Sequence, residues 1–198
     1  MAKKKKSGRP WADHYTRQAK KESYPARSVF KLKEIQLKQN VLKPNDKVLD
    51  LGCAPGSWLL LAAEIVGSGG QVLGLDLTEV TTRLPGHVSV LQCDIFDLDN
   101  AADIGKDFDV VLSDMAPATT GNKNVDVDRS HALCEAALGV SQNRLKTDGI
   151  FVCKIFQGAG IDDFTNSVRA QFNRLKFFKP QSSRKASKEI FIIATGKK

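Results

Sequence analysis

The sequence predicts an α/β fold in which a mostly parallel sheet is covered by helices on both faces. Short apolar runs that are typical of strands alternate along the chain with longer segments that are typical of helices. Several of these runs are continuously apolar, as expected for parallel strands that are buried on both faces. The 198 residues suit one domain, and no internal repeat is present.

The first half of the chain supplies two helices and three strands. Val29, Leu32 and Ile35 lie on one face of a predicted helix at 28–39, and the turn at 43–46 contains Pro44. A strand follows at 47–51, and a glycine-containing loop leads from it into a helix at 57–66, which Gly67 closes. Apolar runs then predict strands at 71–76 and 88–92.

The second half continues the alternation. The run at 109–113 predicts a fourth strand, and the segments 126–146 and 162–175 predict helices. The dipeptide Asp148-Gly149 predicts a turn into a strand at 150–155. A last strand is expected at 189–195.

Positive charge is concentrated at the two ends of the chain. Residues 1–33 contain 11 Lys and Arg against 2 Asp and Glu, and residues 174–198 contain 8 against 1, although the whole chain carries only +8. The part between is therefore acidic. We expect residues 1–25 to form a basic, partly flexible arm and residues 26–198 to form a single domain. Basic ends on an acidic body indicate a polyanionic partner, and added solubility is the alternative explanation.

Composition also indicates where the protein works. The lysine-rich start is followed by no apolar run, and no stretch reaches the roughly 18 apolar residues that cross a bilayer. The four cysteines form no C-x-x-C pair, so we expect reduced thiols and no metal site. These features predict a cytoplasmic protein that binds no membrane.

The loop after the first strand, Asp50 to Trp58, is a candidate cofactor loop. In doubly wound sheets, ligands bind at the carboxyl ends of the strands beside this loop. Gly52 lets the backbone turn sharply, and Gly56 does the same at the start of the helix. Their G-x-x-x-G spacing differs from the G-x-G-x-x-G that binds pyrophosphate. Trp58 is expected either to contact the ligand or to belong to the core.

Two carboxylates indicate which ligand binds beside this loop. Asp76 ends the second strand, where a carboxylate can bind ribose hydroxyls, and Asp94 follows the third, where it can accept from an adenine amino group. These features predict a ligand that contains a nucleoside and no phosphate, and S-adenosylmethionine is such a ligand.

Lys154 is the most informative candidate for catalysis, because it stands within an apolar strand and lysine is rarely buried without a partner. Burial and a second cation, Lys31, would lower the pKa of such an amine and make it a general base. Asp114 and Glu189, which also stand at strand ends, would orient the pair. A purely structural ion pair is the competing interpretation of Lys154.

Five motifs together resemble those of the FtsJ/RrmJ (RlmE) family of ribosomal RNA methyltransferases, over residues 13–197. They are Phe30-Lys31-Leu32, the loop from Asp50 to Trp58, Ser113-Asp114-Met115-Ala116-Pro117, Lys154-Ile155-Phe156-Gln157-Gly158, and Ser182-Ser183-Arg184 with Glu189.

The resemblance implies a Rossmann-like methyltransferase fold with a seven-stranded sheet and a catalytic tetrad. By motif, that tetrad is Lys31, Asp114, Lys154 and Glu189, with Lys154 as the central lysine. Cofactor contacts are implied for Gly56, Trp58, Asp76, Asp94 and Asp114, with Gly52 shaping the loop. The implied reaction transfers the methyl group of S-adenosylmethionine to the ribose 2′-hydroxyl of a uridine in 23S ribosomal RNA, within the large subunit. We expect a monomeric enzyme.

Three alternatives remain open at this point. A 2′-O-methyltransferase acting on transfer RNA or on an mRNA cap would share the tetrad, although the compact length favours ribosomal RNA. A nicotinamide-dependent oxidoreductase is disfavoured by the spacing of Gly52 and Gly56. A non-catalytic RNA-binding protein is disfavoured by the intact tetrad.

Overall fold

The computed structural model describes residues 10–98, 104–117, 121–184 and 187–198. Seven strands form one sheet in these ranges, in the order β3-β2-β1-β4-β5-β7-β6. Their bounds are Lys47–Leu51 (β1), Gln71–Asp76 (β2), Val88–Gln92 (β3), Phe108–Ser113 (β4), Leu145–Phe156 (β5), Phe172–Phe178 (β6) and Glu189–Lys197 (β7). Neighbours are parallel from β3 through β5, and β7 runs antiparallel to both β5 and β6. The predicted mostly parallel, seven-stranded sheet is confirmed.

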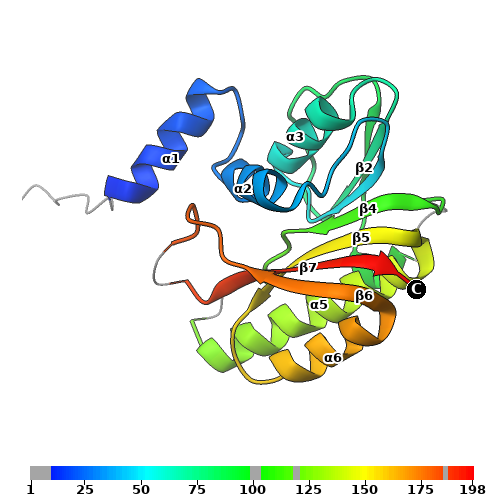
Figure 1. The fold of residues 1–198 in the computed structure, drawn as a ribbon. Coiled ribbons are helices and arrows are strands. Elements are labelled where there is room, and N and C mark those ends of the chain that lie inside the picture. Colours follow the sequence, from blue (N-terminus) through cyan, green and yellow to red (C-terminus); the bar gives the residue numbers. More distant parts are fainter. Residues whose placement is uncertain (1–9, 99–103, 118–120, 185–186) are drawn as a thin grey trace, which may run out of the picture.

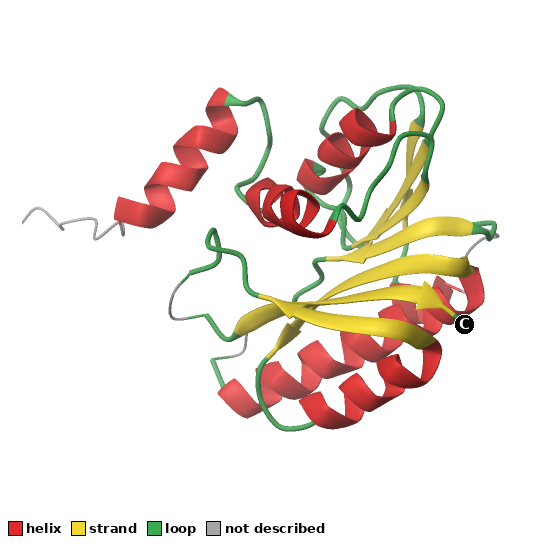
Figure 2. Cartoon of the chain, in the orientation of Figure 1, coloured by secondary structure: helices red, strands yellow, loops and turns green. Residues whose placement is uncertain are grey.

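Helices lie on both faces of the sheet (Figures 1 and 2). They are α1 (Pro10–Lys21), α2 (Val29–Gln39), α3 (Ser57–Val66), α5 (Lys123–Arg144) and α6 (Ile161–Gln171), with a short 3-10 helix, η1, at Ile95–Asp97. Figure 1 shows α2 and α3 on one face and α5 and α6 on the other. None of the helices in the described ranges is both long enough and apolar enough to cross a membrane.

Two apolar cores follow from the alternation of side chains along the strands. Val48 of β1 packs with α2 and α3 on one face, while Leu49 and Leu51 pack toward α5 and α6 on the other. Val110 and Val111 of β4 divide between the faces in the same way. Burial of both faces explains the unbroken apolar runs in the sequence.

The C-terminal region corrects one prediction. The helix expected at 162–175 ends at Gln171, and residues 172–178 form the edge strand β6. Phe172, Leu175 and Phe178 are the more buried positions of β6, and their spacing of three resembles a helix as much as a strand. Antiparallel pairing with β7, from Phe172–Lys197 to Phe178–Phe191, decides the outcome.

The largest other differences from the predictions concern α1, α5 and β5. The helix α1 forms inside the segment that we expected to be an arm, and residues 1–9 lie outside the described ranges. The helix α5 begins at Lys123 rather than 126 and ends at Arg144. The strand β5 begins at Leu145, and its register against β4 shifts near the predicted turn, where Asp148 has a φ of 64°.

Candidate active site

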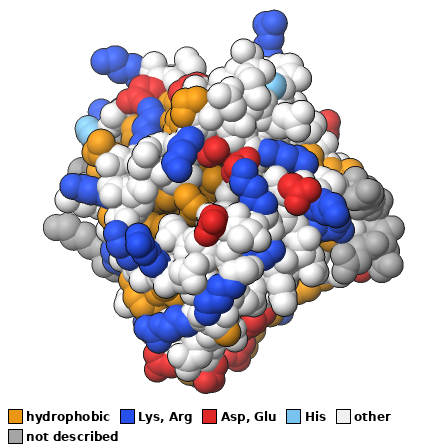
Figure 3. Space-filling model, turned by 45° about the vertical axis from the view of Figure 1, so that its right-hand side comes forward, with side chains coloured by type: hydrophobic (Ala, Val, Ile, Leu, Met, Phe, Trp, Pro, Cys, Tyr) orange, Lys and Arg blue, Asp and Glu red, His pale blue; other side chains and the backbone are white. Residues whose placement is uncertain are grey.

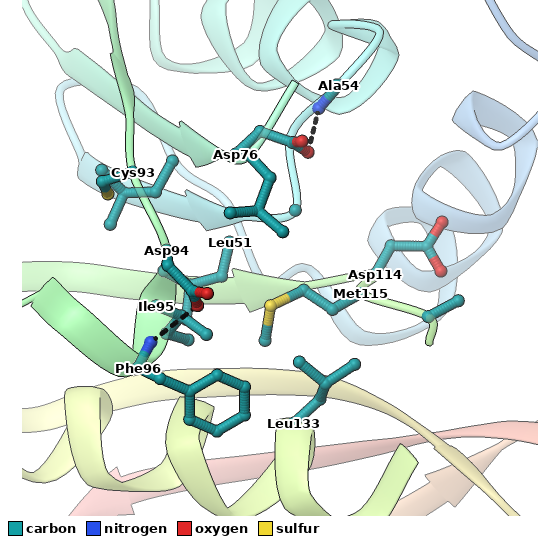
Figure 4. A pocket seen from close by; sticks show the side chains of 14 residues that line it. Leu51, Ala54, Asp76, Cys93, Asp94, Ile95, Phe96, Asp114, Met115 and Leu133 are labelled. Atoms are coloured by element: carbon teal, nitrogen blue, oxygen red, sulfur yellow. Dashed lines mark hydrogen bonds between the residues drawn. The ribbon is translucent and has the colours of Figure 1, made fainter. Parts of the chain in front are cut away.

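A cavity of about 360 Å³ lies at the carboxyl ends of β1, β2 and β4. Figure 4 shows Asp76 on one side of it, the apolar side chains of Met115, Phe96 and Leu133 on the other, and Asp94 next to Phe96. Among the described residues that line this cavity, none is Lys or Arg. A phosphate group would therefore find no cationic partner there, whereas a nucleoside would find both carboxylates and apolar surface.

Gly52 lines this cavity. Its φ is +77°, which side chains of L-residues rarely allow, and its amide donates to the carbonyl of Leu75 at 2.8 Å. A Cβ atom at this position would stand 2.5 Å from Cγ of Met115. A larger residue at position 52 would therefore strain the backbone and clash with Met115.

Asp76 and Asp94 line the cavity while binding the backbone around it. Asp76 accepts hydrogen bonds from the amides of Ala54 (2.8 Å) and Thr78 (2.7 Å), and Asp94 accepts from that of Phe96 (3.0 Å). Each carboxylate oxygen can accept a second hydrogen bond. Both residues are therefore held in place with capacity left for hydroxyl or amino groups of a ligand.

Gly56 and Trp58 do not line the cavity. Gly56 is the N-cap of α3 with a φ of +105°, so its role is in the backbone turn. Trp58 is 3% exposed, packs against Phe191, and donates from Nε1 to the carbonyl of Ser28 at 2.9 Å. Its position favours the core interpretation of Trp58 over the cofactor contact.

The four candidate catalytic residues meet in one cluster. Lys154 Nζ lies 2.9 Å from Oδ1 of Asp114, and Lys31 Nζ lies 3.3 Å from the same oxygen. Lys31 Nζ also lies 3.1 Å from Oε1 of Glu189, and Lys154 Nζ donates to the backbone carbonyl of Asp114. Four elements supply these side chains: α2, the end of β4, β5 and the start of β7. The antiparallel direction of β7 explains why its first residue reaches the carboxyl end of β5.

The cluster is sheltered and is connected to the cavity. The Lys154 side chain is 5% exposed, and those of Lys31, Asp114 and Glu189 are 13% to 14% exposed. Asp114 both lines the cavity and pairs with the two lysines. An amine is thus held where a ligand in the cavity and a group entering from solvent can meet.

Two arginines stand near the solvent side of this cluster. Burial, and next the neighbouring Arg184 guanidinium, lower the pKa of Arg27, while Glu189 acts in the opposite direction. Arg27 precedes α2, and Arg184 belongs to the second basic end of the chain. The fold therefore brings one arginine from each basic end of the chain close to the other, and Arg27 close to Glu189.

Asp50 is a residue of the site to which we assigned no role from sequence. Its carboxylate is 1% exposed, and both oxygens lack a hydrogen-bond partner among the described residues. Burial, followed by the charges of Asp114 and Asp76, raises its pKa well above the usual range. The carboxyl group is therefore protonated in the folded protein at pH values where it ionises in the unfolded chain.

We expect Asp50→Asn to remove a pH dependence of stability. An unfolded Asp ionises above about pH 4, so the unfolded chain releases this proton first as the pH rises. The wild-type free energy of unfolding then falls by up to about 1.4 kcal/mol per pH unit until the raised pKa is reached. Urea unfolding between pH 4 and 7 should show this fall in the free energy of unfolding in the wild type and in the exposed control Asp128→Asn. The fall should be smaller in Asp50→Asn. Parallel profiles for all three proteins would contradict the assignment.

The cysteines are the remaining candidates for a reactive or metal-binding group in the described part of the chain. Cys53, Cys134 and Cys153 are buried free thiols, and Cys93 is half-buried. Within the described ranges, no group of three or more His, Cys, Asp and Glu side chains could hold a metal ion.

The fold and the site define a Rossmann-like methyltransferase. A family model described as FtsJ-like methyltransferase matches residues 24–197. The chain belongs to this family, as the resemblance of its motifs implied.

Curated relatives and solved structures agree with this placement. The chain is 54% identical over 190 residues to "Ribosomal RNA large subunit methyltransferase E" of Desulforapulum autotrophicum, covering 95% of this chain and 94% of that protein. It is 47% identical over 192 residues to the protein of the same name from Bdellovibrio bacteriovorus, covering 94% and 97%. A fibrillarin/Nop5p complex contains a chain with a TM-score of 0.63 at 20% identity, covering 84% of this chain and 80% of that one, and this likeness concerns the fold alone.

Proposed function

We propose that the chain methylates the 2′-hydroxyl of a uridine in large-subunit ribosomal RNA, with S-adenosylmethionine as methyl donor. The observation that carries the proposal is the position of Asp114. It lines the nucleoside cavity and pairs with both Lys31 and Lys154. A donor in the cavity and a base in the cluster would therefore share one carboxylate.

The cavity supports the choice of donor. Asp76 and Asp94 offer acceptors for ribose hydroxyls and an adenine amino group, and Leu77, Ile95 and Phe96 offer apolar surface for the base. When bound, S-adenosylmethionine supplies an electrophilic methyl group on a sulfonium. The G-x-x-x-G spacing of Gly52 and Gly56 differs from that of a pyrophosphate-binding loop, which argues against a dinucleotide such as NAD.

The cluster supports the choice of reaction. A ribose hydroxyl is a weak nucleophile and must lose its proton as its oxygen bonds to the methyl carbon and the carbon–sulfur bond breaks. In our proposal the neutral amine of Lys154 accepts that proton. Asp114 fixes the amine, while Glu189 fixes Lys31 as the second cation. In-line alignment of oxygen, carbon and sulfur depends on this rigid placement.

The surface and the relatives support the substrate. Arg27 and Arg184 stand beside the cluster, where they can bind phosphates of an entering RNA strand. Lys and Arg side chains are spread over most of the face shown in Figure 3. Relatives that are 47% to 54% identical carry the name ribosomal RNA large subunit methyltransferase E. In this proposal the protein acts as a monomer in the cytoplasm, where large subunits are assembled.

The test is transfer of a radiolabelled methyl group to defined RNA substrates. We expect labelling of large ribosomal subunits that lack the modification, and nuclease digestion should release the label as 2′-O-methyluridine. Transfer RNA and subunits that already carry the modification are the controls. Preferential labelling of transfer RNA, or label on a base instead of the ribose, would contradict the proposed substrate.

A further inference from the structure

Glu34 is outside the tetrad, but its carboxylate binds backbone amides of a turn next to the site. It lies three residues after Lys31 on α2, and side chains with this spacing are neighbours on a helix surface. Its Oε2 accepts from the amide of Gln181 at 2.6 Å and its Oε1 from that of Ser182 at 2.8 Å. Both amides belong to residues 180–184, here called the serine turn, which follows β6. Figure 1 shows this connection reaching toward α2.

The serine turn also binds the carboxylate of Glu189, a member of the proposed tetrad. The Ser183 hydroxyl donates to Oε1 of Glu189 at 2.6 Å, and the same oxygen lies 3.1 Å from Lys31 Nζ. Ser183 is 3% exposed, so this hydrogen bond is shielded from water. Within the turn itself, the Ser183 amide donates to the carbonyl of Pro180. Among the described residues, Lys31 and Ser183 thus both contact the carboxylate of Glu189, while Ser187 and Lys179 bind its backbone.

These contacts connect α2 and the serine turn at two points one helical turn apart. Lys31 contacts Glu189, which is itself bound by Ser183 of the serine turn. Glu34 binds the backbone of the serine turn directly. Hydrogen bonds to an ionised carboxylate are short and strong, and a bidentate pair also fixes orientation. A change at Glu34 would therefore be transmitted to the Ser183 hydroxyl and from there to Glu189.

We propose that Glu34 and Ser183 are positioning residues, which hold Glu189 and thereby Lys31 in the geometry that methyl transfer requires. This inference rests on the proposed function, because it assigns a role only to residues that support the tetrad. It adds a carboxylate on α2 and a hydroxyl of the serine turn to the machinery, and neither lines the cofactor cavity.

The first test compares Ser183→Ala with Ser183→Thr in single-turnover methyl transfer at saturating donor and RNA. We expect Ser183→Ala to lower the rate about tenfold, because one hydrogen bond to a charged group is lost. The affinity for S-adenosylmethionine should stay within about twofold, since the cavity is untouched. Ser183→Thr restores the hydroxyl and should recover the rate. The exposed Ser89→Ala is the matched control. A wild-type rate in Ser183→Ala, or no recovery in Ser183→Thr, overturns the role of Ser183.

The second test uses Glu34→Ala, Glu34→Gln and the double variant Glu34→Ala/Ser183→Ala. We expect about a tenfold loss of rate in Glu34→Ala and a smaller loss in Glu34→Gln, which keeps one acceptor oxygen. Because both residues act through Glu189, the double variant should be no slower than the slower single variant. The exposed Glu135→Ala controls for loss of charge. Losses that multiply to about a hundredfold in the double variant show separate roles and overturn the linkage.

Two measurements keep this inference distinct from the proposed function. If Glu34→Ala fails to fold, the comparison of Ser183→Ala with Ser183→Thr still decides the role of the hydroxyl. If Lys154→Ala is inactive while Ser183→Ala turns over normally, the positioning proposal alone is wrong. If Lys154→Ala turns over normally, the proposed base is wrong whatever the serine variants show.

Discussion

Lys154→Ala is expected to lower methyl transfer by about a thousandfold or more, since general base catalysis contributes roughly 10²–10⁴. The Lys154 side chain is 5% exposed, and its Nζ lies 2.9 Å from Oδ1 of Asp114, which holds the amine in the cluster. Affinity for S-adenosylmethionine should remain within about twofold, because Lys154 does not line the cavity. Single-turnover transfer and calorimetric titration with the donor measure the two effects separately.

Lys154→Arg separates the base from a structural ion pair. An arginine keeps the positive charge beside Asp114 but does not deprotonate in a protein. If Lys154 accepts the proton, Lys154→Arg should be as inactive as Lys154→Ala. If the residue only pairs with Asp114, the arginine variant should keep much of the activity. The exposed Lys106→Ala should transfer methyl groups at the wild-type rate.

Asp76→Ala is expected to weaken S-adenosylmethionine binding by about a hundredfold. Hydrogen bonds to a charged acceptor contribute about 1.5–3 kcal/mol each, and two ribose hydroxyls can share this carboxylate. Asp76 also binds the amides of Ala54 and Thr78, so its loss would loosen the wall of the cavity. Titration calorimetry gives the dissociation constant, and NAD should bind neither protein.

The control for Asp76 is the exposed Glu79→Ala, which removes a nearby carboxylate outside the cavity lining. Glu79→Ala should bind the donor with wild-type affinity. Equal affinities of Asp76→Ala and the wild type would show that the nucleoside binds elsewhere, and the cavity at the ends of β1, β2 and β4 would lose its assignment.

The local pattern of apolar and polar residues predicted most of the strands and helices and the carboxylates at the ends of the strands. The strands β1 to β3 begin and end where their apolar runs predicted, and Asp76, Asp94 and Asp114 gather at one edge. Trp58 could not be placed in this way, because an indole beside a loop fits both a cavity wall and a core. Packing against Phe191, which is more than a hundred residues away, favours the core interpretation.

Glu34 and Ser183 show where sequence gives no usable signal. Glu34 is an ordinary charged residue on an amphipathic helix, and only the folded chain brings it to amides 147 and 148 residues away. Ser183 stands in a recognised motif, but the motif does not show that its hydroxyl donates to Glu189.

The alternation of strands and helices from α2 through β5 and the family could be predicted from the residues alone, and the motifs named the four residues that we propose as the tetrad. Parallel strands place their carboxyl ends at one edge, so residues that follow separate strands must converge there. The edge strand β6, the proximity of Arg27 to Arg184 and the support of Glu189 were decided by tertiary structure. Each of them depends on antiparallel pairing with β7 or on contacts between distant segments, and the free energy of such contacts outweighs the local preference of the residues involved.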